Sequence, residues 1–288
     1  MQGLIELPVL LTGIKMGTAV LMVVALSVLA EAVSPRFAGI IAAFPLGAAI
    51  SLFFLGFEMG PPFAAQSALY TLLGLVATLA FAHGYYWSSL QAGKLGKRTN
   101  ILLASTAGAA VYFIAAWGLH FLRASFILSL LLPIVAILVF HHLFRNIEDV
   151  MIAEKVRCTA QLLLFRAFFA AGVVILITST AGMVGPAWAG LFAAFPMTTL
   201  PLLMIIHYSY DAPCVHAVLK SFPKGMGSLV AYTLAVAVLY PRCGIYLGTL
   251  AAYGLATLYL IMIQCFRGHS RPGVRPDRYD PLGTDEAA

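Results

Sequence analysis

The sequence predicts an all-α polytopic membrane protein with about nine transmembrane helices, arranged as two inverted four-helix repeats plus one linker helix. Its composition and an internal duplication lead to this prediction. Of the 288 residues, 61% are apolar and only 10% are charged. A single water-soluble domain could not bury so large a share of apolar residues. Apolar runs of about 20 residues, the length that crosses a bilayer, recur along the chain.

Two stretches of the chain, 151 positions apart, are nearly the same. The first reads PRFAGIIAAFP from Pro35 to Pro45, and the second reads PAWAGLFAAFP from Pro186 to Pro196. Extending the register upstream without a gap pairs Lys15 with Arg166. An ungapped match of this length indicates that the chain arose by internal duplication.

Proline, glycine and charged residues divide the apolar runs into nine predicted spans: 10–32, 36–57, 62–86, 100–120, 125–144, 160–182, 187–208, 225–241 and 243–265. The spans should be helices, because only helices and closed barrels satisfy every backbone group in lipid. The eighth span is short, since Lys220 and Lys224 exclude the residues before it.

The positions of lysine and arginine predict the orientation. With nine crossings, one face receives Arg36, Lys94, Lys97, Arg98, Arg145, Lys155, Arg157, Lys220, Lys224, Arg267, Arg271, Arg275 and Arg278. The other face receives Arg123 and Arg242. Cytoplasmic loops carry the excess of positive charge. We therefore expect a multi-pass protein of the bacterial inner membrane, with its N-terminus outside and its C-terminus in the cytoplasm.

The linker helix determines how the repeats relate. The division is repeat one at 1–122, linker helix and loop at 123–159, repeat two at 160–266, and a disordered cytoplasmic tail at 267–288. The fifth span has no counterpart, so an odd number of crossings separates matching positions. Repeat two should therefore enter the membrane upside down relative to repeat one, as in many secondary transporters.

The repeated prolines mark the candidate site. Pro45 and Pro196 lie about 12 Å from opposite faces of the bilayer core by helical rise, and each should break its helix near the midplane. Phe44 and Phe195 precede them. Paired interruptions at this depth point to a solute site. The alternative is that the prolines only kink helices and aid packing.

Two hydroxyls follow the second proline. Thr198 and Thr199 could bind a solute or hydrogen-bond backbone carbonyls that the proline frees, and the second role is favoured.

Three charged residues complete the candidate site. Lys15 and Arg166 lie inside predicted spans, where a charge is costly. They would stand near opposite faces and could attract an anionic solute, or they could extend to the headgroups. Glu31 could be a protonation site for coupling, although a carboxylate at a span end is usually solvated.

Other chemistry finds little support in the sequence. His83, His120 and His207 lie near predicted span ends, where an interfacial imidazole needs no special role. There is no catalytic constellation, no metal-ligand spacing and no glycine-rich phosphate loop. We therefore expect neither an enzyme nor a bound metal or cofactor, and the net charge of +6 reflects membrane orientation, with no nucleic-acid partner.

One family resemblance adds to this reading. The stretch AGLFAAFPMTT from Ala189 to Thr199, followed by Leu202, His207 and Tyr208, resembles the second helix of the GlpM-like small membrane proteins, which have four spans. The resemblance covers one repeat at a time. Repeat one departs from it, with Gly56 where repeat two has His207. It implies a fused antiparallel pair of such modules.

The leading functional hypothesis is a small inner-membrane secondary transporter or permease, whose solute could be anionic. The alternatives are a non-transporting scaffold for envelope synthesis, in which both prolines pack without a polar cavity, and a lipid flippase with a groove open to lipid. The lipid bilayer is the expected partner. The small faces between Gly13 and Gly17 and between Gly244 and Gly248 would suit either internal packing or a homodimer.

Overall fold

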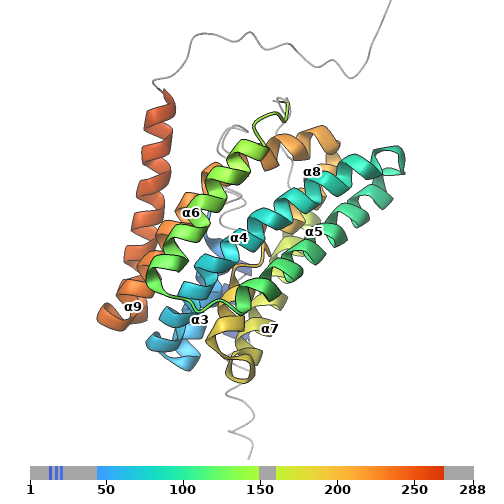
Figure 1. The fold of residues 1–288 in the computed structure, drawn as a ribbon. Coiled ribbons are helices and arrows are strands. Elements are labelled where there is room, and N and C mark those ends of the chain that lie inside the picture. Colours follow the sequence, from blue (N-terminus) through green and yellow to red (C-terminus); the bar gives the residue numbers. More distant parts are fainter. Residues whose placement is uncertain (1–12, 15–16, 19, 22–43, 149–159, 269–288) are drawn as a thin grey trace, which may run out of the picture.

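The computed structural model describes residues 13, 14, 17, 18, 20, 21, 44–148 and 160–268 (Figure 1). Every regular element in these residues is a helix, which confirms the predicted all-α class. The α-helices are α3 (Leu46–Met59), α4 (Pro61–Gln91), α5 (Lys97–His120), α6 (Phe126–Leu143), α7 (Ala160–Ala193), α8 (Thr199–Ser209) and α9 (Ala212–Gly268), and a 3-10 helix, η2 (Ala92–Lys94), follows α4.

The predicted count of nine helices is not supported, because the described residues form seven α-helices. Two of these run through residues that the sequence assigned to separate spans. Helix α7 has a bend at Gly185 (φ 75°, ψ 174°), and α9 has one at Gly244 (φ 73°, ψ 178°). These dihedral angles are open essentially to glycine alone, so each glycine lets the chain reverse direction. Most of the first predicted span lies outside the described residues.

Helix length separates two groups. Helices α4, α5, α6, α7 and α9 are long and apolar enough to cross a membrane. Helices α3 and α8 have 14 and 11 residues, or about 21 and 17 Å by helical rise. Each is too short for a hydrocarbon core of about 30 Å, and each begins just after a Phe-Pro pair.

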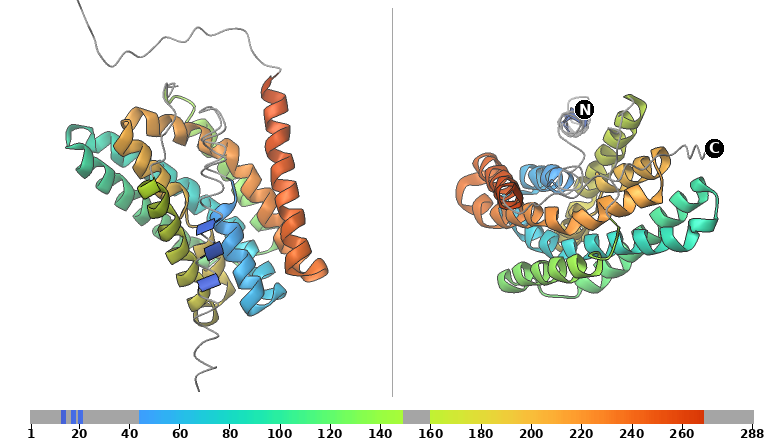
Figure 2. Two further views of the ribbon diagram at one scale, coloured as in Figure 1. Left: turned by 180° about the vertical axis from the view of Figure 1, so that it is seen from behind. Right: turned by 90° about the horizontal axis from the view of Figure 1, so that it is seen from above.

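The exposed surface is that of a membrane protein. Met183 is 88% exposed, Ile114 72% and Leu250 71%, and many other large apolar side chains of the long helices are exposed with them; large exposed apolar surfaces mark contact with a membrane or a partner. Helix α4 forms the centre and contacts α3, α5, α6, α7 and α9. The core is therefore built around α4, with the other helices packed about it (Figure 2), and large apolar side chains of these helices are exposed.

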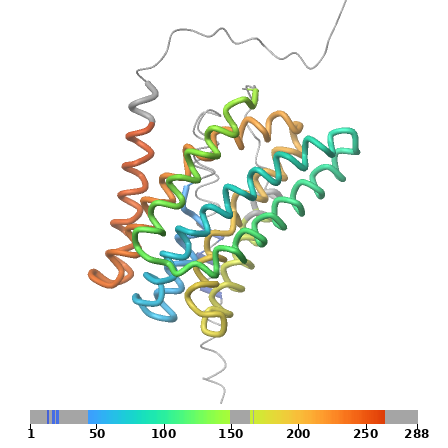
Figure 3. Tube along the Cα trace, viewed as in Figure 1, coloured from blue at the N-terminus to red at the C-terminus, as the bar shows by residue number. Residues whose placement is uncertain are grey.

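The connections between helices lie at two opposite ends of the molecule. Helix α4 rises to the upper end in Figure 3, and the first segment of α9 descends from α8 to its bend at the lower end. Lys94, Lys97 and Arg98 lie at the upper connection between α4 and α5. Arg123 lies between α5 and α6 at the lower end, and Arg242 lies beside the lower bend of α9.

The predicted linker helix is α6. Ser125 caps it by accepting a hydrogen bond from the Leu128 N–H at 3.3 Å. Ser129, Pro133 and Ala136 are its buried residues, and they share one face at helical spacing. The other faces are exposed, as expected for a helix at the edge of the bundle.

The start of α9 differs from the sequence prediction. The helix begins at Ala212, whereas the predicted eighth span began at residue 225. Lys220 and Lys224 lie within this helix and are half-buried, while Phe222 between them and Met226 just after them are buried. The lysines thus mark one face of a helix and do not end it, because a long stem can lie along apolar neighbours.

Candidate functional site

The two Phe-Pro pairs form turns with the same backbone hydrogen bonds. In the first Phe-Pro turn (Phe44–Leu46) the Leu46 N–H donates to the Phe44 carbonyl at 2.7 Å. In the second Phe-Pro turn (Phe195–Met197) the Met197 N–H donates to the Phe195 carbonyl, also at 2.7 Å. A bond between residues two apart defines a γ-turn, and Pro45 (φ −73°, ψ 44°) lies near the inverse form.

The bond that starts the next helix is repeated too. The Ala49 N–H donates to the Pro45 carbonyl at 2.9 Å, and the Leu200 N–H donates to the Pro196 carbonyl at 2.8 Å. Every atom pair in this pattern recurs 151 positions later. At Pro196 the predicted interruption is present, since α7 ends at Ala193 and α8 begins at Thr199.

Both turns line a single small cavity. Its volume is about 30 Å³, enough for roughly two water molecules. Residues matched by the repeat contribute in pairs: Phe44 with Phe195, Pro45 with Pro196, Gly47 with Thr198, Ala48 with Thr199 and Thr78 with Leu229. Residues distant in sequence are therefore brought together around one centre, and the hydroxyls come from Thr78 of α4 and from Thr198 and Thr199 after the second turn.

The residue after the first turn lies directly against the second turn. A Cβ placed on Gly47 would lie 2.7 Å from Cγ of Met197, which follows Pro196. The last segment of α7 also approaches α4 closely, because a Cβ on Gly190 would lie 2.1 Å from the Ser67 carbonyl oxygen. Glycine at these positions allows backbones to approach more closely than any side chain would permit.

Side chains of α4 and α5 satisfy carbonyls near the end of α7. Thr71 Oγ1 donates to the Gly190 carbonyl at 2.9 Å, and Thr78 Oγ1 donates to the Ala194 carbonyl at 2.7 Å. The Tyr112 hydroxyl donates to the Leu191 carbonyl. The final carbonyls of a helix have no partner within it, and lipid offers none. These three hydroxyls stabilise the break ahead of Pro196.

Each turn phenylalanine packs against aromatic rings. Phe195 meets the edge of Tyr112, with centroids 5.1 Å apart, and stacks on Phe113 at 5.7 Å. Phe44 stacks on Tyr253 with centroids 6.0 Å apart. Helix α5 thus supports the second turn, and the last segment of α9 supports the first.

The predicted site residues fall into two groups. Phe44, Pro45, Phe195, Pro196, Thr198 and Thr199 all line the cavity. Lys15 and Glu31 lie outside the described residues, as does the side chain of Arg166, whose backbone belongs to α7. The structure therefore brings together the aromatic, proline and threonine members of the predicted set.

Sequence reasoning missed a second polar cluster, beyond α8. His207 is only 2% exposed, and its Nδ1 lies 3.1 Å from the Tyr85 hydroxyl. His216 is 8% exposed, and its Nε2 lies 2.5 Å from Ser89 Oγ. His207 had been expected at an interface, and His216 fell outside every predicted span. A buried histidine cannot be distinguished from an interfacial one by spacing alone.

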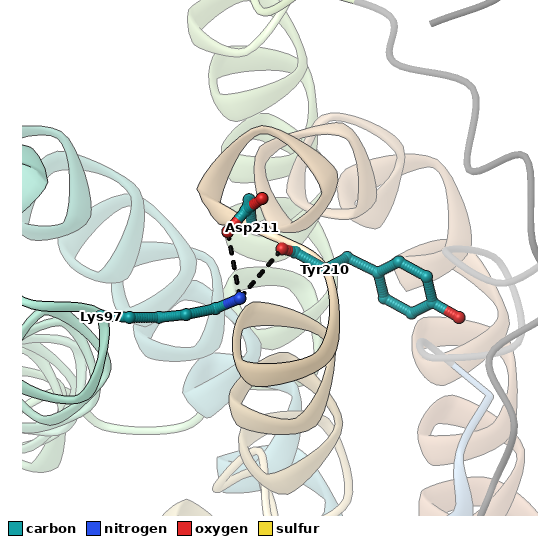
Figure 4. A network of polar contacts seen from close by, with 3 residues as sticks. All are labelled: Lys97, Tyr210 and Asp211. Carbon is teal, nitrogen blue, oxygen red and sulfur yellow. Dashed lines mark hydrogen bonds and ion pairs between the residues drawn. The ribbon is translucent and has the colours of Figure 1, made fainter. Parts of the chain in front are cut away.

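An ion pair closes this cluster at the surface. Figure 4 shows Lys97 of α5 reaching the connection between α8 and α9, where its Nζ lies 3.0 Å from Asp211 and 3.3 Å from the Tyr210 carbonyl. The Lys97 and Asp211 side chains are 41% and 75% exposed. The pair therefore links the start of α5 to the connection after α8 on the solvent side.

No known protein family, curated protein or solved structure matches this chain.

Proposed function

We propose that the protein is a small secondary transporter or permease, in which two inverted repeats enclose a solute site at the Phe-Pro turns. One observation carries the proposal: both turns, 151 positions apart in sequence, line the same cavity. Broken helices that meet at a shared centre are the arrangement by which many secondary transporters bind solutes. Alternating access would come from rocking one repeat against the other.

The course of the chain supports the inverted relation. Helices α4 and the first part of α9 occupy matching positions in the two repeats, and they run in opposite directions (Figure 1). The resemblance to GlpM-like proteins enters this proposal only as the idea of two fused four-helix modules. The distribution of described cations, with Lys94, Lys97 and Arg98 at the end opposite Arg123, supports a cytoplasmic location for the upper end.

The cavity lining favours a small polar solute. Thr78, Thr198 and Thr199 supply hydroxyls, and Phe44 and Phe195 supply flat apolar walls. A volume of about 30 Å³ admits water but no larger solute, so the structure fits a closed conformation of the transport cycle. A preference for anions would depend on Lys15 and Arg166.

The scaffold alternative requires a dry contact between the prolines, and the hydroxyl-lined cavity argues against it. Accessibility of Thr198 tests the difference. Thr198→Cys is made after the native cysteines, Cys158, Cys214, Cys243 and Cys265, are replaced. Sealed vesicles of each orientation are then treated with a membrane-impermeant thiol reagent. Transport by alternating access predicts labelling of this cysteine from both sides.

A matched control lies on the same helix. Leu203 of α8 is fully buried and does not line the cavity, so Leu203→Cys should stay unlabelled in both vesicle types. Protection of the Thr198→Cys variant from both sides would favour the scaffold. Labelling from one side alone would indicate a pit with no path through the protein.

A further inference from the structure

We propose that His207 and His216 form a proton site that controls which side of the membrane the cavity faces. This inference rests on the proposed transport function and adds the coupling ion to it. Both histidines lie in the second half of the chain, on α8 and α9, and both contact hydroxyls of α4. The contact therefore joins one repeat to the other.

The cluster is tightly built. Tyr85 and Ser89 are four residues apart, so they share one face of α4, and both are buried. Asn100 of α5 donates from Nδ2 to the Ser89 carbonyl at 3.1 Å, and the Tyr86 ring meets His216 edge-on, with centroids 4.8 Å apart. Four helices thus converge on two imidazole rings, an arrangement that fixes each ring in place.

Hydroxyl partners suit neutral rings better than charged ones. A neutral imidazole has one donor and one acceptor nitrogen, and a proton makes both of them donors. On protonation of His207, the oxygen of Tyr85 must accept, and its hydrogen must find another partner, whereas the Ser89 hydroxyl already donates to the Tyr86 carbonyl at 3.0 Å and can accept from His216. A buried cation also needs an opposite charge nearby. Proton uptake therefore strains the cluster as it stands.

The surrounding charges show how this strain is relieved. The titratable or charged groups facing the rings are Tyr85 and Tyr86 on α4, Lys97 on α5 and Asp211 ahead of α9, besides the two rings themselves. Among these described groups the negative charge comes from Asp211, which Lys97 already binds at 3.0 Å. A protonated ring is stabilised only if Asp211 leaves Lys97 or water enters. Either change moves the end of α8.

The same helices reach the cavity. Thr199, at the start of α8, lines it, and His207 lies eight residues further on, about 12 Å away along the helix axis. Phe222 of α9 also lines the cavity, six residues after His216. A displacement of the α8 end is therefore transmitted along one short helix to the second Phe-Pro turn.

Repeat one has no equivalent of this cluster. The positions matched to His207 and His216 are Gly56 and Ala65. Protonation of this cluster therefore acts on the second repeat and not on the matching positions of the first, so it can favour one conformation over the other.

The test measures the sidedness of Thr198→Cys labelling at pH 5.5 and pH 8, with the same pH on both sides of the vesicle. The pH dependence of thiol reactivity cancels in the ratio of the labelling rate from one side of the membrane to the rate from the other side. A tenfold difference in proton affinity between the two conformations changes this ratio about tenfold. We expect such a change in the otherwise native protein, and its loss in His207→Gln and in His216→Gln.

His83→Gln is the matched control, because His83 lies on α4, the helix that supplies Tyr85 and Ser89, but packs against Phe140 and Phe144. It should retain the full pH response. A pH-independent ratio in a protein labelled from both sides would refute the proton site and leave the transport proposal standing. If the cysteine is labelled from neither side, both the proton site and the transport proposal are refuted.

A second measurement covers variants that fail to fold. Nitrogen-15 NMR of histidine-labelled native protein in nanodiscs should show two rings titrating together with the labelling ratio. Rings that stay in one protonation state across this pH range would overturn the proposal, and so would a full pH response in the conservative variant Ser89→Ala.

Discussion

The first and second Phe-Pro turns have the same backbone hydrogen bonds but differ in the polar groups around them. Both have the same pair of hydrogen bonds, displaced by 151 positions. After the first turn come Gly47 and Ala48, and after the second come Thr198 and Thr199. Hydroxyls of α4 and α5 bind carbonyls ahead of the second turn.

This difference indicates that the geometry of the turns and the polar groups around them have separate origins. The local sequence around each proline sets the turn geometry, since proline fixes φ and removes a donor wherever it stands. The polar groups come instead from other helices and from the two residues after the proline, where the repeats have diverged. Thr198 and Thr199, after the second turn, supply hydroxyls to the cavity, whereas the first turn supplies shape and close packing.

Substitution of Gly190 and Gly47, the glycines at close contacts beside the two turns, should have the largest effect on stability and should separate the two turns most clearly. In Gly190→Ala the new Cβ meets the Ser67 backbone oxygen at 2.1 Å, so α7 must separate from α4. We expect a loss of about 3 kcal/mol or more in the free energy of unfolding, measured by thermal unfolding in detergent. In Gly47→Ala the Cβ meets the flexible Met197 side chain, and about 1 kcal/mol should be lost.

Gly182 supplies the control on the same helix as Gly190. A Cβ there would lie 3.6 Å from Met59 Cε, an ordinary contact. Gly182→Ala should therefore be neutral or slightly stabilising, because alanine favours a helix. Equal losses at positions 190 and 182 would show that the close approach of α7 and α4 is not what requires glycine.

Removal of one carbonyl partner should have an intermediate effect. Thr78→Val keeps the shape of the side chain but leaves the buried Ala194 carbonyl without its donor at 2.7 Å, at a cost of about 1–3 kcal/mol. The control is Thr106→Val, because Thr106 is exposed on α5 and its hydroxyl bonds only carbonyls of its own helix. Similar losses in both variants would contradict the stabilising role of Thr78.

The sequence predicted the site through repetition and missed what was not repeated. Pro45 and Pro196 stood out because they occupy matching positions in a repeated motif. Thr71, Thr78 and Tyr112 gave no such signal, since their matching positions are Phe222, Leu229 and Ile263. A threonine within an apolar span is ordinary, and only the neighbouring helix decides whether its hydroxyl binds a carbonyl.

Helix boundaries were the other failure, and they hid His216. Hydropathy treats Lys220 and Lys224 as the end of an apolar run, although both lie on α9 with Phe222 buried between them. The error removed residues 212–224 from the predicted helices, and His216 with them. The helix count differs for a related reason. Helices α7 and α9 each continue through a glycine bend, at Gly185 and Gly244, close to where the sequence prediction placed a break between two spans.

The outer ends of α3 and α8 extend the comparison and give the smallest predicted effect on stability. Gly60 connects α3 to α4, and its matching position is Asp211, which pairs with Lys97. The pair is solvent-exposed, so Lys97→Gln should change the free energy of unfolding by less than about 1 kcal/mol, and Lys94→Gln should match it. A loss well above this value would mean that the pair holds α8 in place.

The same variant should nevertheless shift the pH response, because stability and proton affinity depend on different charges. Removing the Lys97 charge frees Asp211 and removes a cation from the vicinity of His207, and both changes favour a protonated ring. The midpoint of Thr198→Cys sidedness should therefore move to higher pH in Lys97→Gln and stay in place in Lys94→Gln. A shift to lower pH would mean that Asp211 does not stabilise the protonated histidines, and that the link from the ion pair to the second Phe-Pro turn runs through some other contact.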